Sequence, residues 1–234
     1  MLYVKTTRNS LPQVTIPKTL SYALAFLLLE FVCMQAHEVI HHVTGRIVCG
    51  AWGTMTFNVF YLAPGCFETK NIALISTFAG PALSYVLMWL GMLLVLKNRY
   101  ALFGFSLIFA NLPFARFITV AMAGGDEMVI GRRFAGAAAY PLILCLVVLI
   151  LLPPLIVAFK SINVKRPWLV LLAFLLLPLA YDALTKRVLL APMIDRWEVL
   201  AAHVWGVPLF IICVDAVVLV SLASCARSFR PRTN

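Results

Sequence analysis

The chain has 234 residues, of which 63% are hydrophobic and only 12% are charged, and its formal net charge is +10. Soluble globular proteins are about half apolar and about a quarter charged, so this composition excludes an ordinary soluble fold and indicates an integral membrane protein. Lys and Arg mostly flank the hydrophobic runs. This placement is typical of loops next to a membrane, so no nucleic-acid partner is expected.

Six hydrophobic segments are long enough to cross a bilayer, for which a helix needs about 20 residues. They are 19–42, 72–96, 101–123, 137–159, 168–190 and 205–225. The sequence therefore predicts an all-α polytopic, multi-pass membrane protein. The first segment is longer than the roughly 7–15 apolar residues of a signal peptide, so we expect it to be retained. The small size and the lack of organelle signals favour the inner membrane of a prokaryote.

The first hydrophobic segment ends in a cluster of histidines, in the stretch MQAHEVIHHVTGR from Met34 to Arg46. His37 and His41 are four residues apart, so a helix places both imidazoles on one face, where they can bind one zinc ion. Glu38 is rotated by about 100° from His37 and can hold a reactive water without being a ligand. This is the His-Glu-x-x-His pattern of zinc hydrolases. The alternative interpretation is a polar cap where the helix leaves the membrane.

A different kind of stretch, CGAWGTMTFNVFYLAPG from Cys49 to Gly65, separates the first two segments. Polar and apolar residues partly alternate over Thr54–Val59, which predicts a short β-hairpin at 49–65; an irregular loop is the alternative. Backbone that is not helical cannot face lipid with unpaired groups, so the hairpin is expected at the interface or packed within protein. The six cysteines include no Cys-x-x-Cys pair, so we expect neither a disulfide framework nor a cysteine zinc site.

A catalytic zinc site usually needs a third protein ligand besides two histidines. The first and third segments run in the same direction, so the acids that follow the third segment, Asp126 and Glu127, reach the membrane face where the histidines lie. Asp126 is the predicted ligand and Glu127 is its rival. The other candidates are Asp195, Glu198 and His203 on the same side, with Asp182 and Asp215 inside the last two segments.

The distribution of basic residues predicts an orientation. With six spans, both termini lie on one side of the membrane, here called side A, and the histidines lie on the other, side B. Side A carries eleven Lys and Arg residues and side B carries seven. The positive-inside rule therefore favours side A in the cytoplasm.

Three motifs, in order, resemble the site-2 protease family of intramembrane zinc metalloproteases. HEVIHHVTGRIVCG is similar to the family's His-Glu-x-x-His helix, STFAGPALSYVLMWLGMLLV to its Ala-Gly-Pro helix, and ANLPFARFITVAMAGGDE to its Asn-x-x-Pro…Asp segment. The resemblance covers about residues 19–130. It implies an N-terminal segment at 1–18, a catalytic membrane core at 19–130 with three helices and the hairpin, and three additional helices with a short tail at 131–234.

The resemblance also implies roles for five residues. His37, His41 and Asp126 would bind Zn²⁺, Glu38 would be the general base, and Asn111 would contact the substrate backbone. The hairpin would pair with an unwound substrate helix as an added strand, which is β-augmentation. Related enzymes place the histidine end towards the cytosol, which is the opposite of the orientation that the charges favour.

The chain departs from the family pattern in several places. Asn111 and Asp126 are 15 residues apart, a longer spacing than is usual in the family, and the proline at 113 breaks a helix between them. Glu127 follows the acid, where the family typically has Gly. Ser84 stands where the family has Asn; its spacing of four from Gly80 is also typical of small-residue contacts between helices.

Taken together, the sequence predicts a zinc metalloendopeptidase that hydrolyses peptide bonds in or near the transmembrane segments of membrane-protein substrates, in regulated intramembrane proteolysis. The lipid bilayer and a transmembrane substrate are the expected partners, and substrate selection would rest on the membrane core or on a regulatory membrane partner. Two alternatives stay open. One is a metal-binding membrane transporter, which should show polar residues deep in several helices. The other is a noncatalytic membrane scaffold with a vestigial zinc site, which would not need Glu38.

Overall fold

The first helix, α1, spans Leu20–Cys49 in the computed structural model, which describes residues 11–66 and 71–230. It begins where the Thr19 side chain accepts a hydrogen bond from the Tyr22 amide (3.3 Å). It ends at Gly50, whose φ of 76° is one that glycine adopts without strain. Its 30 residues reach about 45 Å, which exceeds a hydrocarbon core of about 30 Å. The helix therefore continues past its predicted end at 42 and is longer than one upright crossing of the bilayer requires.

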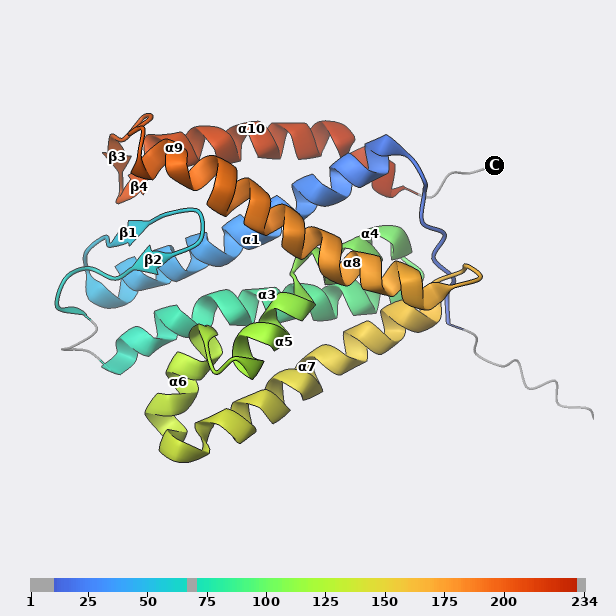
Figure 1. Cartoon of the computed structure of the whole chain (residues 1–234), viewed down its shortest axis with the longest axis horizontal. Coiled ribbons are helices and arrows are strands. Elements are labelled where there is room, and N and C mark those ends of the chain that lie inside the picture. Colours follow the sequence, from blue (N-terminus) through green and yellow to red (C-terminus); the bar gives the residue numbers. More distant parts are fainter. Residues whose placement is uncertain (1–10, 67–70, 231–234) are drawn as a thin grey trace, which may run out of the picture.

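Five further helical stretches form the bundle together with α1 in the described part of the chain (Figure 1). The second stretch is η1 (Asn71–Ala73) with α3 (Leu74–Leu96), and the third is α4 (Ala101–Ala110) with α5 (Pro113–Ala121). The fourth is α6 (Gly125–Ala135), η2 (Gly136–Ala138) and α7 (Ala139–Ser161), and the fifth is α8 (Pro167–Asp182), the π-helix η3 (Ala183–Leu190) and α9 (Ala191–Asp195). The sixth is α10 (Leu209–Cys225) with η4 (Ala226–Phe229). All six are long and apolar enough to cross a membrane, which confirms the predicted number of spans.

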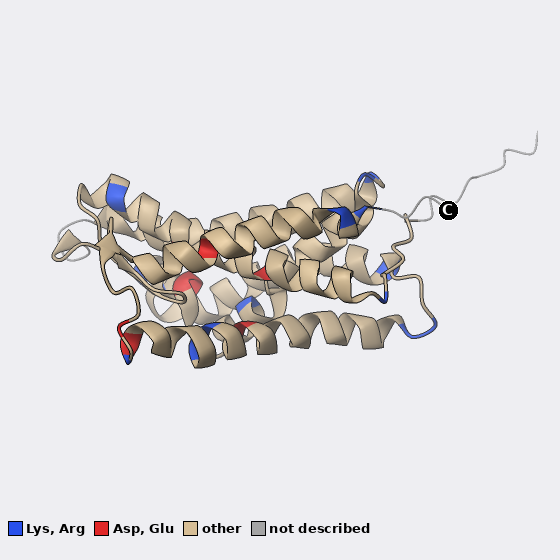
Figure 2. Ribbon diagram, turned by 90° about the horizontal axis from the view of Figure 1, so that it is seen from above, with Lys and Arg blue, Asp and Glu red and all other residues tan. Residues whose placement is uncertain are grey.

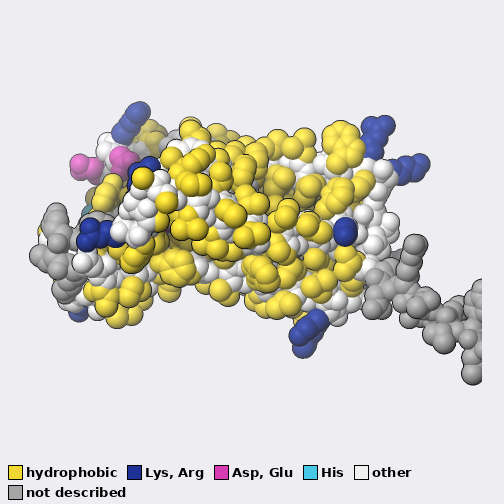
Figure 3. Space-filling model, turned by 90° about the horizontal axis from the view of Figure 1, so that it is seen from below, with side chains coloured by type: hydrophobic (Ala, Val, Ile, Leu, Met, Phe, Trp, Pro, Cys, Tyr) yellow, Lys and Arg dark blue, Asp and Glu magenta, His cyan; other side chains and the backbone are white. Residues whose placement is uncertain are grey.

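The surface agrees with a membrane-embedded protein. Hydrophobic side chains cover the middle of the face in Figure 3, and Lys and Arg lie towards its two ends. Large apolar side chains such as Leu149, Leu177 and Val217 are more than 60% exposed, an arrangement that soluble monomers avoid over large areas. The chain is therefore an all-α, multi-pass integral membrane protein. Residues 1–10 and 231–234 of the predicted terminal segments lie outside the described residues.

Close packing fixes the central helices against one another. Gly91 of α3 meets Gly104 of α4: a Cβ on Gly91 would lie 2.5 Å from the Gly104 carbonyl oxygen, so this approach requires glycine. The Phe174 ring of α8 then packs on α4, with centroids 5.0 Å from Phe105 and 5.4 Å from Phe109. These contacts hold α3, which supports the candidate site described below, in a fixed position in the bundle.

The third stretch is broken between α4 and α5. Pro113 lacks a backbone donor, so it cannot continue α4 and instead occupies the first turn of α5. Leu112, just before it, has a φ of 48°, and the chain changes direction there. The helix break expected from Pro113 is confirmed.

Two small hairpins lie at the side B end of the bundle (Figure 1). β1 (Thr54–Met55) pairs antiparallel with β2 (Phe60–Tyr61), which confirms the predicted hairpin. β3 (His203–Val204) pairs with β4 (Val207–Pro208). The Met55 amide donates to the Gly206 carbonyl (3.1 Å), so the second hairpin covers the outer edge of β1. The outer edge of β2 pairs with no other strand in the described part of the chain.

Two predictions about this end are wrong. The sixth helix begins at Leu209 rather than at 205, because 203–208 form the second hairpin. Cys49 and Cys66 form a disulfide across the base of the first hairpin, with Cα atoms 5.6 Å apart. Their separation of 17 residues carries no motif, so only the folded hairpin shows that they meet.

Candidate metal centre

Three side chains from distant parts of the chain converge near the side B end of the bundle. His37 and His41 come from α1, and Asp126 comes from the first turn of α6. The two histidine Nε2 atoms are 3.0 Å apart, and Asp126 Oδ2 lies 3.5 Å from His37 Nε2 and 3.3 Å from His41 Nε2. Among the described residues this is the one group of three His, Cys, Asp or Glu whose ligand atoms lie this close together.

The spacing of these atoms fits a metal ion. A tetrahedral ion with bonds of about 2.0–2.1 Å holds its ligand atoms about 3.3 Å apart, and the three observed separations are 3.0, 3.3 and 3.5 Å. Asp126 is 28% exposed, while His37 and His41 are 2% and 1% exposed. The cluster is thus buried on its helix side and open on its acid side, and it could hold a metal ion.

Helix α3 fixes the orientation of both imidazoles. His41 Nδ1 donates to the Ser76 carbonyl oxygen (2.6 Å), and His37 Nδ1 lies 3.1 Å from Ser84 Oγ. Since α3 contacts the Nδ1 atom of each ring, the Nε2 atoms are left free to hold a shared metal ion. Ser76 and Ser84 are both fully buried, so water does not compete for these bonds.

Ser84→Ala tests this support. We expect it to weaken metal binding by about 10–100-fold, because His37 loses a hydrogen bond that sets its tautomer and ring orientation. The measurement is a titration of the purified protein against a metal chelator. Ser106→Ala is the matched control, since Ser106 is also fully buried but bonds to Tyr22 and Leu102. An equal loss of affinity in both variants would contradict the assigned role of Ser84.

Gly80 makes the close contact between α3 and the histidines possible. A Cβ on Gly80 would lie 2.1 Å from His41 Nε2 and 2.7 Å from His37 Cε1, far inside van der Waals contact. Gly80 and Ser84 are therefore a small-residue helix contact, as their spacing predicts, and they also lie directly against the ligand pair.

The turn before α6 brings Asp126 to α1 and sends Glu127 elsewhere. The Gly124 amide donates to the Thr119 carbonyl (2.8 Å), and Gly125 has a φ of 84°, which reverses the chain. The Tyr85 hydroxyl donates to Glu127 Oε1 (2.7 Å), so that carboxylate is directed towards α3 and not to the histidines. The geometry favours Asp126 over its rival. The other candidate ligands, Asp182, Asp195, Glu198, His203 and Asp215, do not join the cluster.

Arg116 of α5 also reaches the centre, although no motif in the sequence marks it. Its Nη2 lies 3.0 and 3.1 Å from the two ring nitrogens of His37, and its Nη1 lies 3.9 Å from Asp126 Oδ2. The side chain is 12% exposed. The signal in the sequence was a basic residue inside a hydrophobic segment rather than at its end, which is costly in a membrane and usually functional.

The remaining predicted site residues lie in different settings. Glu38 follows His37 in α1 and is 9% exposed. Asn111 is fully buried at the end of α4, where its Nδ2 donates to the Leu107 carbonyl (2.8 Å). It does not line the cleft beside the centre, so its contact with substrate stays a prediction.

His42, next to the cluster in sequence, joins the two hairpins. Its Nε2 donates to the Trp205 carbonyl oxygen (2.8 Å), and its ring stacks on Trp52 with centroids 5.0 Å apart. It therefore supports the second hairpin where that hairpin covers β1, and it is not a member of the metal-ligand group.

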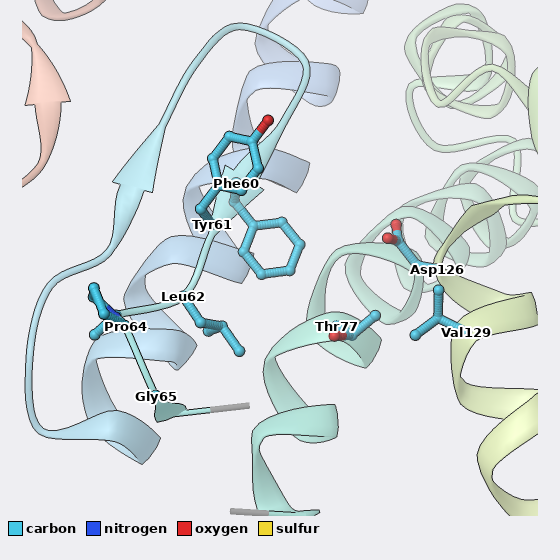
Figure 4. Close-up of a pocket in the computed structure, with 9 residues that line it drawn as sticks. Phe60, Tyr61, Leu62, Pro64, Gly65, Thr77, Asp126 and Val129 are labelled. Atoms are coloured by element: carbon cyan, nitrogen blue, oxygen red, sulfur yellow. The ribbon is translucent and has the colours of Figure 1, made fainter. Parts of the chain in front are cut away.

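A cleft of about 380 Å³ opens beside the metal centre (Figure 4). One wall is β2 with the residues that follow it, from Phe60 to Gly65, and the opposite wall is Asp126 and Val129 of α6; Thr77 of α3 lines it as well. Phe60 also stacks on His41, with ring centroids 4.2 Å apart and planes 10° apart. The strand β2 is therefore held next to the candidate ligand His41 by a side-chain contact.

Comparison of the chain with protein-family models, with curated proteins and with solved structures finds no match. The fold and the site by themselves define the class: a multi-pass helical membrane protein with a candidate His-His-Asp metal centre next to a strand edge.

Proposed function

We propose that this chain is an intramembrane zinc metalloprotease, similar to the site-2 protease family that its motifs resemble. The observation that carries the proposal is the convergence of His37, His41 and Asp126, with Glu38 as the residue next to a ligand. Two imidazoles and one carboxylate with an open side are a ligand set that catalytic zinc uses. The substrate is a peptide bond in or near a transmembrane segment of another membrane protein.

The bound ion would polarise the scissile carbonyl and make a water molecule nucleophilic at neutral pH. Glu38 accepts the proton of the attacking water and passes it to the leaving amine. Arg116 of α5 lies beside His37 and Asp126. Its guanidinium donates to the oxygen of the scissile carbonyl as negative charge develops on that oxygen. The cleft beside Asp126 supplies the route for water, since it opens to the outside of the bundle.

The edge of β2 is the proposed binding site for the scissile segment. A helix hides its carbonyls in its own hydrogen bonds, so a substrate helix must unwind before hydrolysis. An extended segment can then pair with the outer edge of β2, which β1 and the second hairpin leave free. The cleft lies between that edge and Asp126, so an added strand would pass over the metal ligands.

The test is to purify the protein, measure bound zinc and follow cleavage of a single-span membrane substrate by wild type and Glu38→Gln. We expect Glu38→Gln to keep its zinc and to lose cleavage by about 10²–10⁴-fold, the usual contribution of a general acid–base residue. Glu198→Gln, the same change in a loop between α9 and β3, should cleave at the wild-type rate. Cleavage that is unaffected by Glu38→Gln would refute the mechanism.

One observation favours a second candidate, metal or proton transport. Lys186 Nζ and Asp182 Oδ1 form an ion pair (2.9 Å), and Lys186 is 1% exposed. Glu30 is fully buried nearby, and neither of its carboxylate oxygens has a hydrogen-bond partner among the described residues. Ionisable groups at membrane depth often line ion paths. Zinc flux into vesicles that does not depend on Glu38 would favour transport over proteolysis.

A further inference from the structure

The side A end of the bundle is basic without any acidic residue. Its described segments, 11–18, 97–100, 160–166 and 226–230, contain eight Lys and Arg and no Asp or Glu. The basic residues are Lys18, Lys97, Arg99, Lys160, Lys165, Arg166, Arg227 and Arg230. In Figure 2 the end of the ribbon near the C-terminus is coloured for Lys and Arg only. This end therefore attracts anions at a membrane surface.

A cavity of about 900 Å³ is set into this basic end. The segment before α1 forms one wall, the turn between α3 and α4 forms another, and the residues after α10 form the third. The first wall is anchored, because the Val14 amide donates to the Ser161 carbonyl (2.7 Å) at the end of α7. The cavity is thus built from three separate parts of the chain that meet at the membrane interface.

Three cationic side chains line this cavity: Lys18, Arg227 and Arg230. No Asp or Glu lines it, and none of the three cations takes part in an ion pair within the part of the chain that the structure describes. Hydrogen-bonding side chains, including Ser21 and Asn98, lie on the same walls. This combination of unpaired cations and polar donors fits a phosphate group.

The cavity also has apolar walls, which distinguish a lipid from a free anion. Val14 and Leu102 are 2% and 8% exposed and line the cavity, together with Ile16 and Ala101. A free phosphate makes no use of apolar surface, whereas the glycerol and first acyl carbons of a phospholipid bury theirs. We propose that this cavity binds an anionic phospholipid, with the headgroup phosphate held by Lys18, Arg227 and Arg230.

The orientation of the chain agrees with this assignment. The basic excess favours side A in the cytoplasm, and the cytoplasmic leaflet is the one that holds anionic lipid in excess. The Cys49–Cys66 disulfide lies at the opposite end of α1, where an oxidising compartment would allow it to persist. The basic excess and the disulfide both favour side A as the cytoplasmic side. The lipid proposal does not depend on the proposed protease activity.

The test measures lipid retention by the full chain in detergent, using native mass spectrometry with phosphatidylglycerol and phosphatidylcholine. The variant Lys18→Gln/Arg227→Gln/Arg230→Gln removes the three cavity cations. The control Lys160→Gln/Lys165→Gln/Arg166→Gln removes three exposed cations from the same membrane side outside the cavity. If the triple variant does not fold, the single substitution Arg230→Gln is used for the same measurement.

We expect the wild type to retain phosphatidylglycerol in preference to phosphatidylcholine. The cavity variant should bind phosphatidylglycerol about a hundredfold more weakly, and Arg230→Gln about fivefold more weakly, given the usual contribution of each basic residue near an anionic surface. The control should stay close to wild type. Equal losses in the control would overturn the proposal in favour of diffuse surface charge. Displacement of the lipid by millimolar inorganic phosphate would overturn it in favour of a free-anion site.

Discussion

Asp126→Ala is expected to abolish stable metal binding and, with it, all cleavage. The two histidines lie four residues apart in one helix and would supply two ligand atoms, and Asp126 Oδ2 lies within 3.5 Å of both Nε2 atoms. A catalytic zinc site usually needs three protein ligands. Loss of a hydrogen bond to a ligand typically lowers metal affinity by about 10–100-fold, and loss of the ligand itself should lower it further. The measurement is zinc content per chain after dialysis, followed by the cleavage assay.

Glu127→Ala is the matched control for that experiment. Glu127 is the adjacent residue in α6 and carries the same charge, but its carboxylate accepts from the Tyr85 hydroxyl and lies 4.0 Å from Arg116 Nη1. We expect this variant to keep its zinc, with a loss of stability from the unpaired Tyr85 hydroxyl. If Glu127→Ala loses its metal while Asp126→Ala keeps it, the third ligand is assigned to the wrong acid.

The parts of the site that follow from local geometry could be predicted from the sequence. The helical pitch alone places His37 and His41 on one face, and α1 places them as expected. Counting spans placed Asp126 at the same end of the bundle, because the first and third stretches run in the same direction. The hairpin could also be predicted, since alternation and glycine punctuation are local signals.

The parts that depend on side-chain direction could not be predicted. Nothing in the sequence states that Arg116 points into the bundle towards His37, since the same residue on the opposite helix face would reach the headgroups. Similarly, the Cys49–Cys66 bond depends on how the hairpin closes. Ser84 stands where the resemblance expects Asn, and only the structure shows that its hydroxyl lies within hydrogen-bond reach of the His37 ring.

The burial of Lys186, outside the candidate metal centre, also could not be predicted from the sequence. Lys186 lies in the π-helix η3, with its ammonium 5.1 Å from the Phe31 ring centroid and paired with Asp182. The sequence places Lys186 near the end of the fifth hydrophobic segment at 168–190, a position from which a lysine side chain can equally extend to the headgroups. The wider π turn keeps that segment helical to Asp195 and buries Lys186 against α1. Such segments are rare and often mark functional positions.

Gly80→Ala is expected to disable the metal centre while the helices still assemble. The added methyl would lie 2.1 Å from His41 Nε2 and 2.7 Å from His37 Cε1, so both rings must rotate or α3 must move away from α1. Overpacking of this kind costs about 1–3 kcal/mol of stability. The effect on function should be larger, because a displacement of about 1 Å at a reacting centre can reduce the rate about 10²-fold. Bound zinc and cleavage rate are the measurements.

Two comparisons separate a local effect of Gly80→Ala from a loss of fold. Gly124→Ala is the same substitution at a glycine whose added Cβ would meet nothing closer than the Thr119 carbonyl oxygen at 3.4 Å, and it should keep both zinc and activity. Thermal unfolding in the presence of a chelator reports the stability of the bundle without metal. We expect Gly80→Ala to unfold cooperatively, about 2–12 °C below the wild-type metal-free temperature given that stability cost, and yet to bind zinc at least a hundredfold more weakly, since both ligand rings are displaced. Normal zinc binding in Gly80→Ala would mean that α3 does not pack tightly against the histidines. The role of α3 in orienting His37 and His41 would then be wrong.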